Sequence, residues 1–464
     1  MGEAKSYFFV GIGGSGMLPL AMIVHGRGHE VKGSDRSLDQ GSVAAKFDDL
    51  RRRGIELFSQ DGSGITSPDQ IVVASAAVED DVPDMVKTRA VGAARMGRPE
   101  LLAELFNGAQ TGIAIGGTSG KSTVTGMVGW ILHRAGRDPT VMNGAVMKNF
   151  VSPEQPFASA LVGNGAEFVS EVDESDGSIA LYAPDIAVLN NITLDHKSLD
   201  ELRHLFRDFA MKAGTVVVNL DDDETRLLAA MLPPDKLRTC SLRDEGAAYY
   251  GTDIVEEPFA VSFRVNGLPL RLQVPGRHNV ENALVALAAA EAAGVPLAAA
   301  IEVLAGFKGL GRRFELVGTA NGVSVIDDFG HNPEKIAATL RTLHAFPGRL
   351  LVFFQPHGFV PLRVMREEFT DMFARELAPD DVLLMPDPVY YGGTTDRSVG
   401  SDAIIAAVVD RGRKAEHMAE PPPERRLTTA RLVELARPGD RIVIMGARDD
   451  TLTLFARDLL ARLG

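Results

Sequence analysis

The eight residues GGTSGKST at positions 116–123 are the stretch of the chain that decides its fold. They follow a strand-like apolar run at 112–115 and precede a helix-like run at 121–135. The backbone amides of such a turn can surround phosphate oxygens at a helix N-terminus, with a lysine on the terminal phosphates and a serine on Mg2+. The segment therefore predicts an ATP- and Mg2+-binding domain built on a parallel sheet. The predicted ATP-binding residues here are Gly117, Thr118, Ser119, Gly120, Lys121, Ser122 and Thr123.

The first glycine of this segment falls one position later than in the standard eight-residue phosphate loop, because residue 115 is Ile115. A purely structural glycine-rich turn with an exposed lysine therefore stays open as an alternative.

The region around this loop alternates strands and helices, which predicts a central α/β domain. Strands are expected at 167–172, 186–190 and 215–219, and a helix at 199–211. Short alternating runs over 249–274, with Asn-Gly at 266 and 267, predict a small antiparallel insertion.

The N-terminal part of the chain reads as a Rossmann-like domain, with strands at 7–12, 30–33 and 71–75 and a helix at 17–27. The segment GIGGSG at 11–16 matches the pattern GxGxxG, and Asp35 ends the next strand. Such a loop can hold a dinucleotide or the pyrophosphate of any nucleotide, and it can also be glycine packing alone.

The C-terminal part is expected to be a second Rossmann-like domain, entered through a glycine-rich hinge at 306–311. Its expected strands are 323–327, 350–354, 382–385 and 442–445, and its expected helices include 334–344 and 452–463. The predicted domains are 1–108, 109–309 and 310–464.

The composition is that of a folded chain of several domains, with 464 residues, 45% apolar and 24% charged. The formal charge of −14 argues against a nucleic-acid-binding surface. Cys240 is the single cysteine, which excludes an intramolecular disulfide and a cysteine-based zinc cluster. We see no signal peptide and no stretch of transmembrane length, so we expect a cytoplasmic protein without a membrane partner.

Polar clusters follow several of the predicted strands, where ligands gather in open α/β sheets. The carboxylates of EVDESD at 171–176 suit Mg2+, although a solvated acidic loop is the alternative. His196 ends another strand and is a candidate metal ligand or phosphate-orienting group, but lone histidines are usually structural. Later clusters at 276–282, 312–314 and 327–333 offer asparagines, paired arginines and an Asp with a His, each also explicable as caps or surface charges.

Taken in order, these segments resemble the Mur ligase family, and within it the branch of UDP-N-acetylmuramate:L-alanine ligases. The segments are GIGGSGM, GSD, GTSGKST, EVDESD, TLDH, GRHNVENALVA, GRRFE, DDFGHNP and FQPH, and they span nearly the whole chain. The resemblance implies a UDP-sugar-binding domain, a central ATPase domain and a C-terminal domain that closes over the amino acid. It also implies an ADP-forming ligase of peptidoglycan precursor synthesis that acts through an acyl phosphate on small-molecule substrates, as a monomer or homodimer.

Residue by residue, the resemblance implies four groups of site residues. Lys121, His196, Asp328 and His331 would be catalytic. Asn279, Asn282 and Arg313 would join the phosphate loop in binding ATP. The UDP-sugar would be held by Gly11, Gly13, Gly14, Ser15, Gly16, Ser34 and Asp35. The metal would be held by Ser122, Glu171 and His196.

The chain departs from typical alanine-adding members at three substrate-facing positions. Ser119 and Asn332 stand where those members have a histidine, and Gly358 stands where they have an arginine after Gln-Pro-His. The stretch 205–207 lacks the lysine that other branches carbamoylate, which agrees with the alanine-adding branch.

These departures keep alternatives open within the family: a ligase that attaches a preformed peptide, or one that uses another acid and amine. A nicotinamide-dependent oxidoreductase is a remote alternative, suggested by GIGGSG and Asp35. It does not account for GTSGKST and EVDESD.

Overall fold

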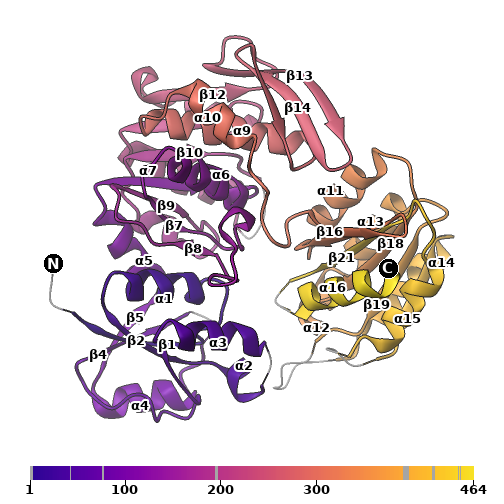
Figure 1. Ribbon diagram of the computed structural model, residues 1–464, viewed down its shortest axis with the longest axis horizontal. Helices are drawn as coiled ribbons and strands as arrows, with labels where there is room; N and C mark the ends of the chain where they lie inside the picture. The colour runs from indigo at the N-terminus through magenta and orange to yellow at the C-terminus, as the bar shows by residue number, and fades with distance from the viewer. Residues whose placement is uncertain are drawn as a thin grey trace. The chain divides into compact units, whose positions relative to one another are not determined.

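Three β-sheets with flanking helices make up the chain in a computed structural model (Figure 1). The structure describes residues 4–41, 43–75, 78–193, 197–389, 397–420, 424–447, 449 and 451–464. One compact unit contains Met1–Glu256 with Ala260–Leu310, and the other contains Glu257–Phe259 with Gly311–Gly464. The predicted three-domain α/β fold class is confirmed, whereas the residue bounds assigned to the domains stay a prediction.

The N-terminal sheet of the first unit is parallel throughout, in the order β3-β2-β1-β4-β5. Its strands are β1 Ser6–Val10, β2 Glu30–Ser34, β3 Glu56–Phe58, β4 Gln70–Ala74 and β5 Ala94–Gly97. Its helices are α1 Met17–Gly26, α2 Arg36–Asp39, α3 Ala44–Arg52, α4 Pro83–Val91 and α5 Arg98–Asn107. The central strand β1 is almost wholly apolar and buried, as a parallel strand covered on both faces must be.

The second sheet of this unit has ten strands, in the order β15-β14-β13-β12-β11-β10-β6-β9-β7-β8. Its bounds are β6 Thr111–Gly116, β7 Thr140–Met142, β8 Ala160–Leu161, β9 Glu167–Glu171, β10 Ile186–Leu189, β11 Thr215–Asn219, β12 Leu237–Ser241, β13 Tyr249–Glu257, β14 Ala260–Val265 and β15 Leu268–Leu272. The predicted antiparallel hairpin is β14–β15, and its turn residues Asn266 and Gly267 have φ of 48° and 82°. Those positive angles explain the Asn-Gly pair.

Helices cover the ten-stranded sheet on both faces. They are α6 Lys121–Arg134, α7 Leu199–Lys212, α8 Asp223–Ala229, α9 Arg277–Ala292 and α10 Leu297–Leu304, with short 3-10 turns η1 Lys148–Phe150, η2 Ser178–Leu181 and η3 Pro234–Lys236. Helices α6, α9 and α10 share one apolar core, which also buries Cys240 completely. Burial in this core raises the pKa of the Cys240 thiol well above its usual value.

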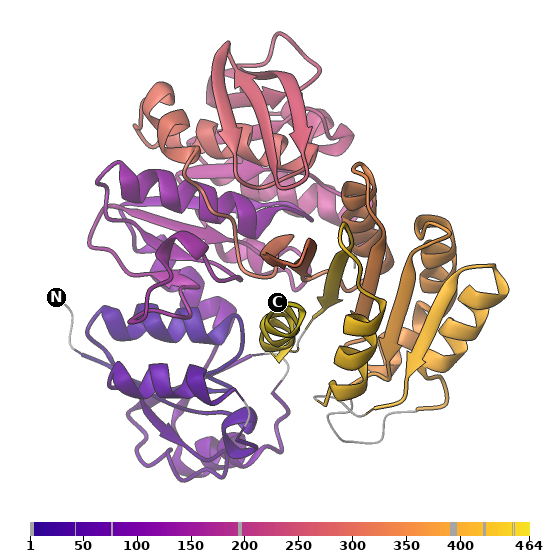
Figure 2. The ribbon, with the colours of Figure 1, turned by 45° about the vertical axis from the view of Figure 1, so that its right-hand side comes forward.

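The second unit contains a six-stranded sheet in the order β16-β17-β21-β18-β19-β20. Its strands are β16 Glu315–Ala320, β17 Val323–Asp328, β18 Leu350–Gln355, β19 Val382–Pro386, β20 Lys414–Met418 and β21 Arg441–Gly446. Its helices are α11 Pro333–His344, α12 Phe359–Val364, α13 Arg366–Glu376, α14 Ser401–Asp410, α15 Arg426–Leu435 and α16 Thr451–Leu463. Only β16 runs antiparallel to its neighbour among the strands with described registers, and helices pack on both faces (Figure 2).

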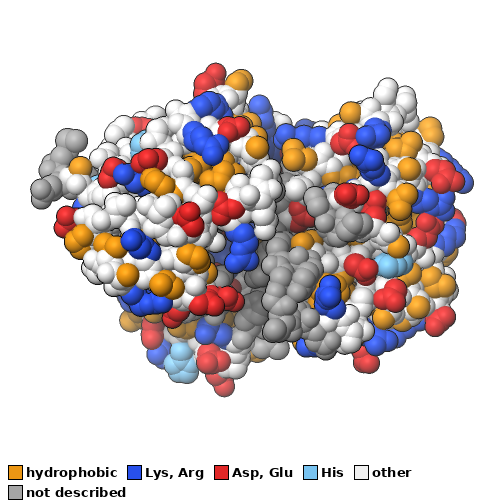
Figure 3. All heavy atoms as spheres, turned by 90° about the horizontal axis from the view of Figure 1, so that it is seen from below, with side chains coloured by type: hydrophobic (Ala, Val, Ile, Leu, Met, Phe, Trp, Pro, Cys, Tyr) orange, Lys and Arg blue, Asp and Glu red, His pale blue; other side chains and the backbone are white. Residues whose placement is uncertain are grey.

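Acidic and basic side chains are interspersed over the face shown in Figure 3. Among the described residues, each helix is too short or too polar to cross a bilayer.

Phe106 on α5 joins the cores beneath the two sheets of the first unit. Its ring lies edge-on to Phe168 and Tyr182, with centroids 5.6 and 5.2 Å away, and it is 1% exposed. We expect Phe106→Ala to lower the free energy of unfolding by about 3–5 kcal/mol, because the cavity cannot close fully. Urea denaturation followed by circular dichroism measures this loss.

The matched control is Leu181→Ala, because Leu181 adjoins Tyr182 but is 43% exposed. Its loss should stay within about 0.5 kcal/mol. Equal losses in the two variants would contradict the role given to Phe106.

Candidate active site

The predicted phosphate loop connects the buried strand β6 to helix α6. Gly117 has φ of 145° and Gly120 has φ of 82°, both in the region that favours glycine. Lys121 is the first residue of α6, and Ser122 and Thr123 follow in its first turn. The loop therefore leads directly into the N-terminus of a 14-residue helix, where anions are stabilised.

Two asparagines after β10 hold this loop in place. The Thr118 N–H donates to the Asn191 carbonyl at 3.1 Å, and the Ser119 N–H donates to Asn191 Oδ1 at 2.8 Å. Asn190 Nδ2 donates to the Ser119 carbonyl at 3.0 Å. All these contacts fix main-chain atoms of the loop, so its shape depends on the end of β10.

Asn282 and Asn279 lie beside the loop in the first two turns of α9. Asn282 Oδ1 accepts from Asn190 Nδ2 at 2.9 Å, and Asn282 Nδ2 donates to Asn279 Oδ1 at 3.0 Å. Both asparagines are at least 94% buried, since their exposed fractions are 4% and 6%. Their contact with adenine stays a prediction, and the role visible here is support of the loop.

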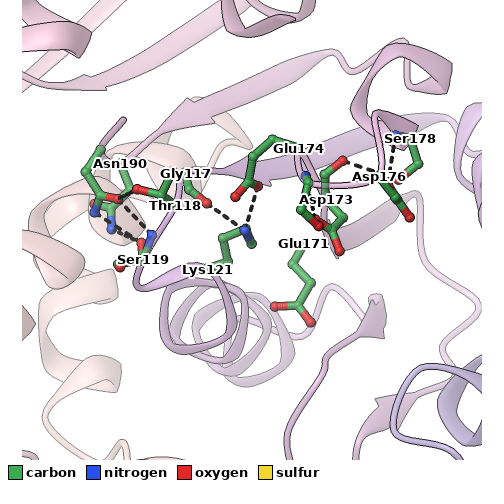
Figure 4. A network of polar contacts seen from close by, with 12 residues as sticks. Gly117, Thr118, Ser119, Lys121, Glu171, Asp173, Glu174, Asp176, Ser178 and Asn190 are labelled. Atoms are coloured by element: carbon green, nitrogen blue, oxygen red, sulfur yellow. Dashed lines mark hydrogen bonds and ion pairs between the residues drawn. The ribbon is translucent and has the colours of Figure 1, made fainter. Parts of the chain in front are cut away.

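The ammonium group of Lys121 is held at the mouth of the loop (Figure 4). Lys121 Nζ donates to the Gly117 carbonyl at 2.7 Å and pairs with Glu174 Oε2 at 2.6 Å. Burial raises the pKa of Glu174 above its usual value, although the Lys121 charge acts in the opposite direction. A lysine held between a carbonyl and a carboxylate is placed where phosphate oxygens would meet it.

Ser122 and Glu171 provide two oxygen donors beside the loop. The Ser122 hydroxyl donates to Glu171 Oε2 at 2.7 Å, and Glu171 ends strand β9. Hydroxyl and carboxylate oxygens suit Mg2+, so these two residues fit the predicted metal. Among the described residues, no three His, Cys, Asp or Glu side chains cluster as a metal site. The third predicted ligand, His196, lies outside the described residues.

The N-terminal glycine loop connects β1 to α1. The amides of Gly11 and Ile12 donate to the Ser34 carbonyl at 2.8 and 3.0 Å. The Gly13 amide donates to Asp35 Oδ2 at 2.8 Å. Asp35 is 7% exposed, and its other oxygen caps α2 through the Ser37 amide at 2.8 Å.

The other predicted UDP-sugar residues lie around this loop. Gly14 and Ser15 are exposed, and Gly16 immediately precedes α1. The Ser34 hydroxyl donates to the buried Asp84, whose pKa is raised by burial. Within the loop region, therefore, Ser34 and Asp35 make structural contacts, and their contact with a ligand stays a prediction.

In the second unit, the predicted catalytic residues follow strand β17. Asp328 accepts from the amides of Phe314 and Gly330, both at 2.8 Å, and from the Thr339 hydroxyl at 3.0 Å. His331 Nδ1 lies 2.9 Å from the Phe329 carbonyl, and burial lowers the His331 pKa to about 4. His331 is therefore neutral at pH 7.

The arginine pair at the start of the second unit takes two different positions. Arg313 lies over the Phe329 ring, 4.8 Å from its centroid. Arg312 donates to Asp327 at 3.3 Å and to the carbonyls of Gly446 and Asp449 at 2.6 and 3.1 Å. Arg312 thus ties the segment before β16 to the ends of β17 and β21, a contact that the sequence analysis did not predict.

Of the three departures, Asn332 has a structural role that its side chain carries. Asn332 caps α11, with its Oδ1 accepting from the Lys335 amide at 2.9 Å. Gly358 precedes α12 in an extended conformation, where a Cβ would lie 3.5 Å from Pro361 Cδ. A side chain at position 358 would therefore make only ordinary van der Waals contacts, so the fold does not require glycine there. The contacts of Ser119 with the two asparagines after β10 use its main chain, so they do not depend on its side chain.

Three family models match the chain, and together they cover most of it. They are described as "Mur ligase family, catalytic domain" over residues 6–110, "Mur ligase middle domain" over 115–290, and "Mur ligase, glutamate ligase domain" over 312–448.

Relatives of known name are similar over nearly their whole length. The chain is 35% identical to the UDP-N-acetylmuramate--L-alanine ligase of Mycolicibacterium vanbaalenii, over 99% of this chain and 97% of that protein. It is 35% identical to the protein of the same name from Chelativorans sp., over 97% of this chain and 96% of the relative.

Solved structures of two ligases have the same fold. The UDP-N-acetylmuramate-alanine ligase of Thermotoga maritima matches with a TM-score of 0.78 at 24% identity, over 98% of each chain. A murein peptide ligase from Psychrobacter arcticus matches with a TM-score of 0.72 at 23% identity, over 99% of each chain.

Gly120→Ala tests the support of the phosphate loop. A Cβ at Gly120 would lie 2.5 Å from Asn190 Nδ2 and from Asn282 Oδ1, in a conformation with φ of 82°. We expect ATP affinity to fall at least about tenfold, because the loop must leave the asparagine pair. Isothermal titration calorimetry with ATP measures the change.

Gly136→Ala is the matched control at the other end of α6. Gly136 has φ of 76° but no heavy atom within 4 Å of its Cβ position, so only backbone strain is added. ATP affinity should be unchanged in this variant. An equal loss in both variants would contradict the role of the asparagine pair.

His331→Gln tests the buried imidazole through the pH dependence of stability. The unfolded His331 takes up a proton near pH 6.5, whereas the folded one does so near pH 4. Its contribution is therefore present above pH 6.5 and lost as the pH falls to 4. We expect this loss to be on the order of 1–3 kcal/mol in the native chain and absent from His331→Gln.

Thermal unfolding of both proteins between pH 4 and pH 7 measures the difference. Asp327, whose pKa is raised by burial to about 6, titrates in the same window but is present in both proteins. The exposed His204, replaced by Gln, serves as the control. Parallel pH profiles for the native chain and His331→Gln would contradict the burial of a neutral His331.

Proposed function

Because this chain belongs to the Mur ligase family of ATP-dependent ligases, we propose that it joins UDP-N-acetylmuramate to L-alanine in peptidoglycan precursor synthesis. The single observation that carries the proposal is the 35% identity, over 99% of the chain, to a ligase named for these two substrates. The ordered phosphate loop around Lys121 supports it. Family membership also removes the nicotinamide-dependent alternative.

The reaction follows from the chemistry of a carboxylate, which is a poor electrophile. A carboxylate oxygen attacks the γ-phosphorus of ATP, the bond to the bridging oxygen breaks, and ADP leaves. The amine then attacks the carbonyl carbon of the acyl phosphate, phosphate leaves, and the amine nitrogen loses a proton. Negative charge develops on the transferring phosphoryl group and then on the tetrahedral oxygen, so fixed cations and amides supply the stabilisation.

We assign the first step to the central domain. Lys121 and the loop amides other than the two that donate to Asn191 would bind the β- and γ-phosphates. The Lys121 ammonium would then exchange its pair with Glu174 for the phosphate oxygens. Ser122 and Glu171 would hold Mg2+, which neutralises phosphate charge when bound. Lys121 and Ser122 begin one helix, so their positions relative to the phosphates would be fixed together.

We assign the amine to the region around Asp328 and His331 in the second unit. An imidazole with a pKa near 4 carries no charge at pH 7, so it would not repel an incoming ammonium group. Asp328 would attract that group, while its three hydrogen bonds hold the carboxylate in one orientation. Arg313 would contribute to phosphate binding.

We assign the uridine diphosphate to the glycine loop at Gly11, Gly13, Gly14, Ser15 and Gly16. The loop precedes the 10-residue helix α1, whose N-terminus favours an anion. Contacts of the sugar nucleotide with Ser34 and Asp35 would be made beside their structural hydrogen bonds.

A second candidate is a family member that joins a preformed peptide or another amine. The observations that favour it are Gly358 and Asn332, which replace the arginine and histidine expected near the amine. Removal of an arginine lowers the affinity for a carboxylate, and only a free amino acid presents its carboxylate on the carbon that bears the reacting amine. We further propose that the enzyme acts in the cytoplasm on small molecules alone, as a monomer or homodimer.

The experiment that tests the proposal measures phosphate release from ATP and Mg2+ with UDP-N-acetylmuramate, across single amino acids and short peptides. We expect L-alanine to stimulate release in the native chain. Lys121→Ala should abolish turnover while sparing the binding of UDP-N-acetylmuramate. Phosphate release that a peptide stimulates and L-alanine does not would favour the second candidate. The absence of stimulated phosphate release with every amine would contradict both candidates.

Gly358→Arg sharpens this experiment, because a side chain fits at this position. If L-alanine is the amine, the restored arginine should lower the KM for L-alanine and leave the KM for ATP unchanged. Gly214→Arg is the control, since Gly214 is exposed, its φ is not positive, and a Cβ there would lie 3.5 Å from the nearest atom, the Asp185 carbonyl oxygen.

A further inference from the structure

Arg98 places a positive charge directly beside the N-terminal glycine loop. It is the first residue of α5, and its side chain lies against Gly16, the residue before α1. A Cβ at Gly16 would lie 3.2 Å from both Cδ and Nη1 of Arg98. The guanidinium group therefore lies where the α1 N-terminus already favours an anion.

Two amides of the loop near Arg98 remain without an acceptor among the described residues. The amides of Gly11, Ile12 and Gly13 are used by Ser34 and Asp35, as described above. The amides of Ser15 and Gly16 have no acceptor within the part of the chain that the structure describes. The loop therefore offers N–H donors at Ser15 and at Gly16, the residue against which Arg98 lies.

The ionic partner of Arg98 is loosely held. Arg98 Nη2 lies 3.6 Å from Asp176 Oδ2, beyond hydrogen-bond distance, and the two side chains are 24% and 37% exposed. Asp176 belongs to the acidic segment after β9, and its other oxygen accepts from the Ser178 amide at 2.8 Å. A pair of this kind contributes little to stability, so a stronger anion can replace Asp176.

We propose that Arg98 binds the diphosphate of the uridine nucleotide and that the diphosphate replaces Asp176 as its partner. This inference rests on the proposed function, and it adds a binding residue and a competing carboxylate to the nucleotide site. A guanidinium group presents paired N–H donors that match two phosphate oxygens, which a carboxylate at 3.6 Å does not use. Asp176 holds Arg98 beside the loop until the nucleotide arrives.

If the diphosphate replaces Asp176 as the partner of Arg98, substitutions of Arg98 and Asp176 should change the affinity for UDP in opposite directions. Arg98→Gln removes a donor to the diphosphate, so UDP binds at least about tenfold more weakly. Arg98→Lys keeps the charge but not the paired donors, and it gives an intermediate affinity. Asp176→Asn removes the competitor, so UDP binds a few-fold more tightly when Arg98 is present and no more tightly in Arg98→Gln.

The measurement is calorimetric titration of the full chain and its variants with UDP and, separately, with uridine. Uridine lacks phosphate, so its affinity is unchanged in every variant. The matched control is Arg95→Gln, because Arg95 lies three positions away on β5 and pairs with Asp80 at 2.8 Å. Circular dichroism confirms that the variants are folded.

Equal affinity of the native chain and Arg98→Gln for UDP would overturn the inference and leave the proposed function intact. Weakened uridine binding in Arg98→Gln would also overturn it, because the loss would then be structural. Weaker UDP binding in Asp176→Asn would show that Asp176 orients Arg98 and does not compete. A native chain that binds neither UDP nor uridine would overturn the proposed function itself.

Discussion

The buried hydrogen bond between Asn190 and Asn282 is the contact on which the rest of the site depends. It connects the end of β10 to the second turn of α9, and Asn190 also donates to the carbonyl of Ser119 in the loop. Asn190 Nδ2 and Asn282 Oδ1 are a neutral donor and a neutral acceptor, so their burial requires no counter-ion, although Asn190 Oδ1 has no partner within the described residues. Because glycine at 120 leaves the space that these amides fill, loop, strand and helix have to form together.

Two carboxylates position the two cations that lie beside the glycine-rich loops. Lys121 pairs with Glu174 and Arg98 with Asp176, and both carboxylates belong to the segment that follows β9. The closer pair is the more buried one, since the Glu174 side chain is 6% exposed and that of Asp176 is 37% exposed. One short acidic segment thus contributes charge beside two glycine-rich loops.

The sequence predicted the parts of the fold that have a local signal. Strands such as β6, β10 and β11 are unbroken apolar runs, and Asn266-Gly267 encodes a turn with positive φ. The strands β3, β5 and β20 were missed because their short sequences ELF, ARMG and KAEHM carry no apolar run or alternation. The Asn190–Asn282 and Arg98–Asp176 contacts join residues 92 and 78 positions apart, so no local pattern could predict them.

Because Cys240 is completely buried, thiol reagents find no cysteine on the surface of the folded chain. With one cysteine in 464 residues, enclosed in the core under α9 and kept protonated by burial, the native protein should not react with maleimides. Any cysteine introduced at an exposed position then becomes the single site of labelling. Two such positions, one in each unit, would carry a fluorophore pair and report the distance between the units in solution without removal of a native residue.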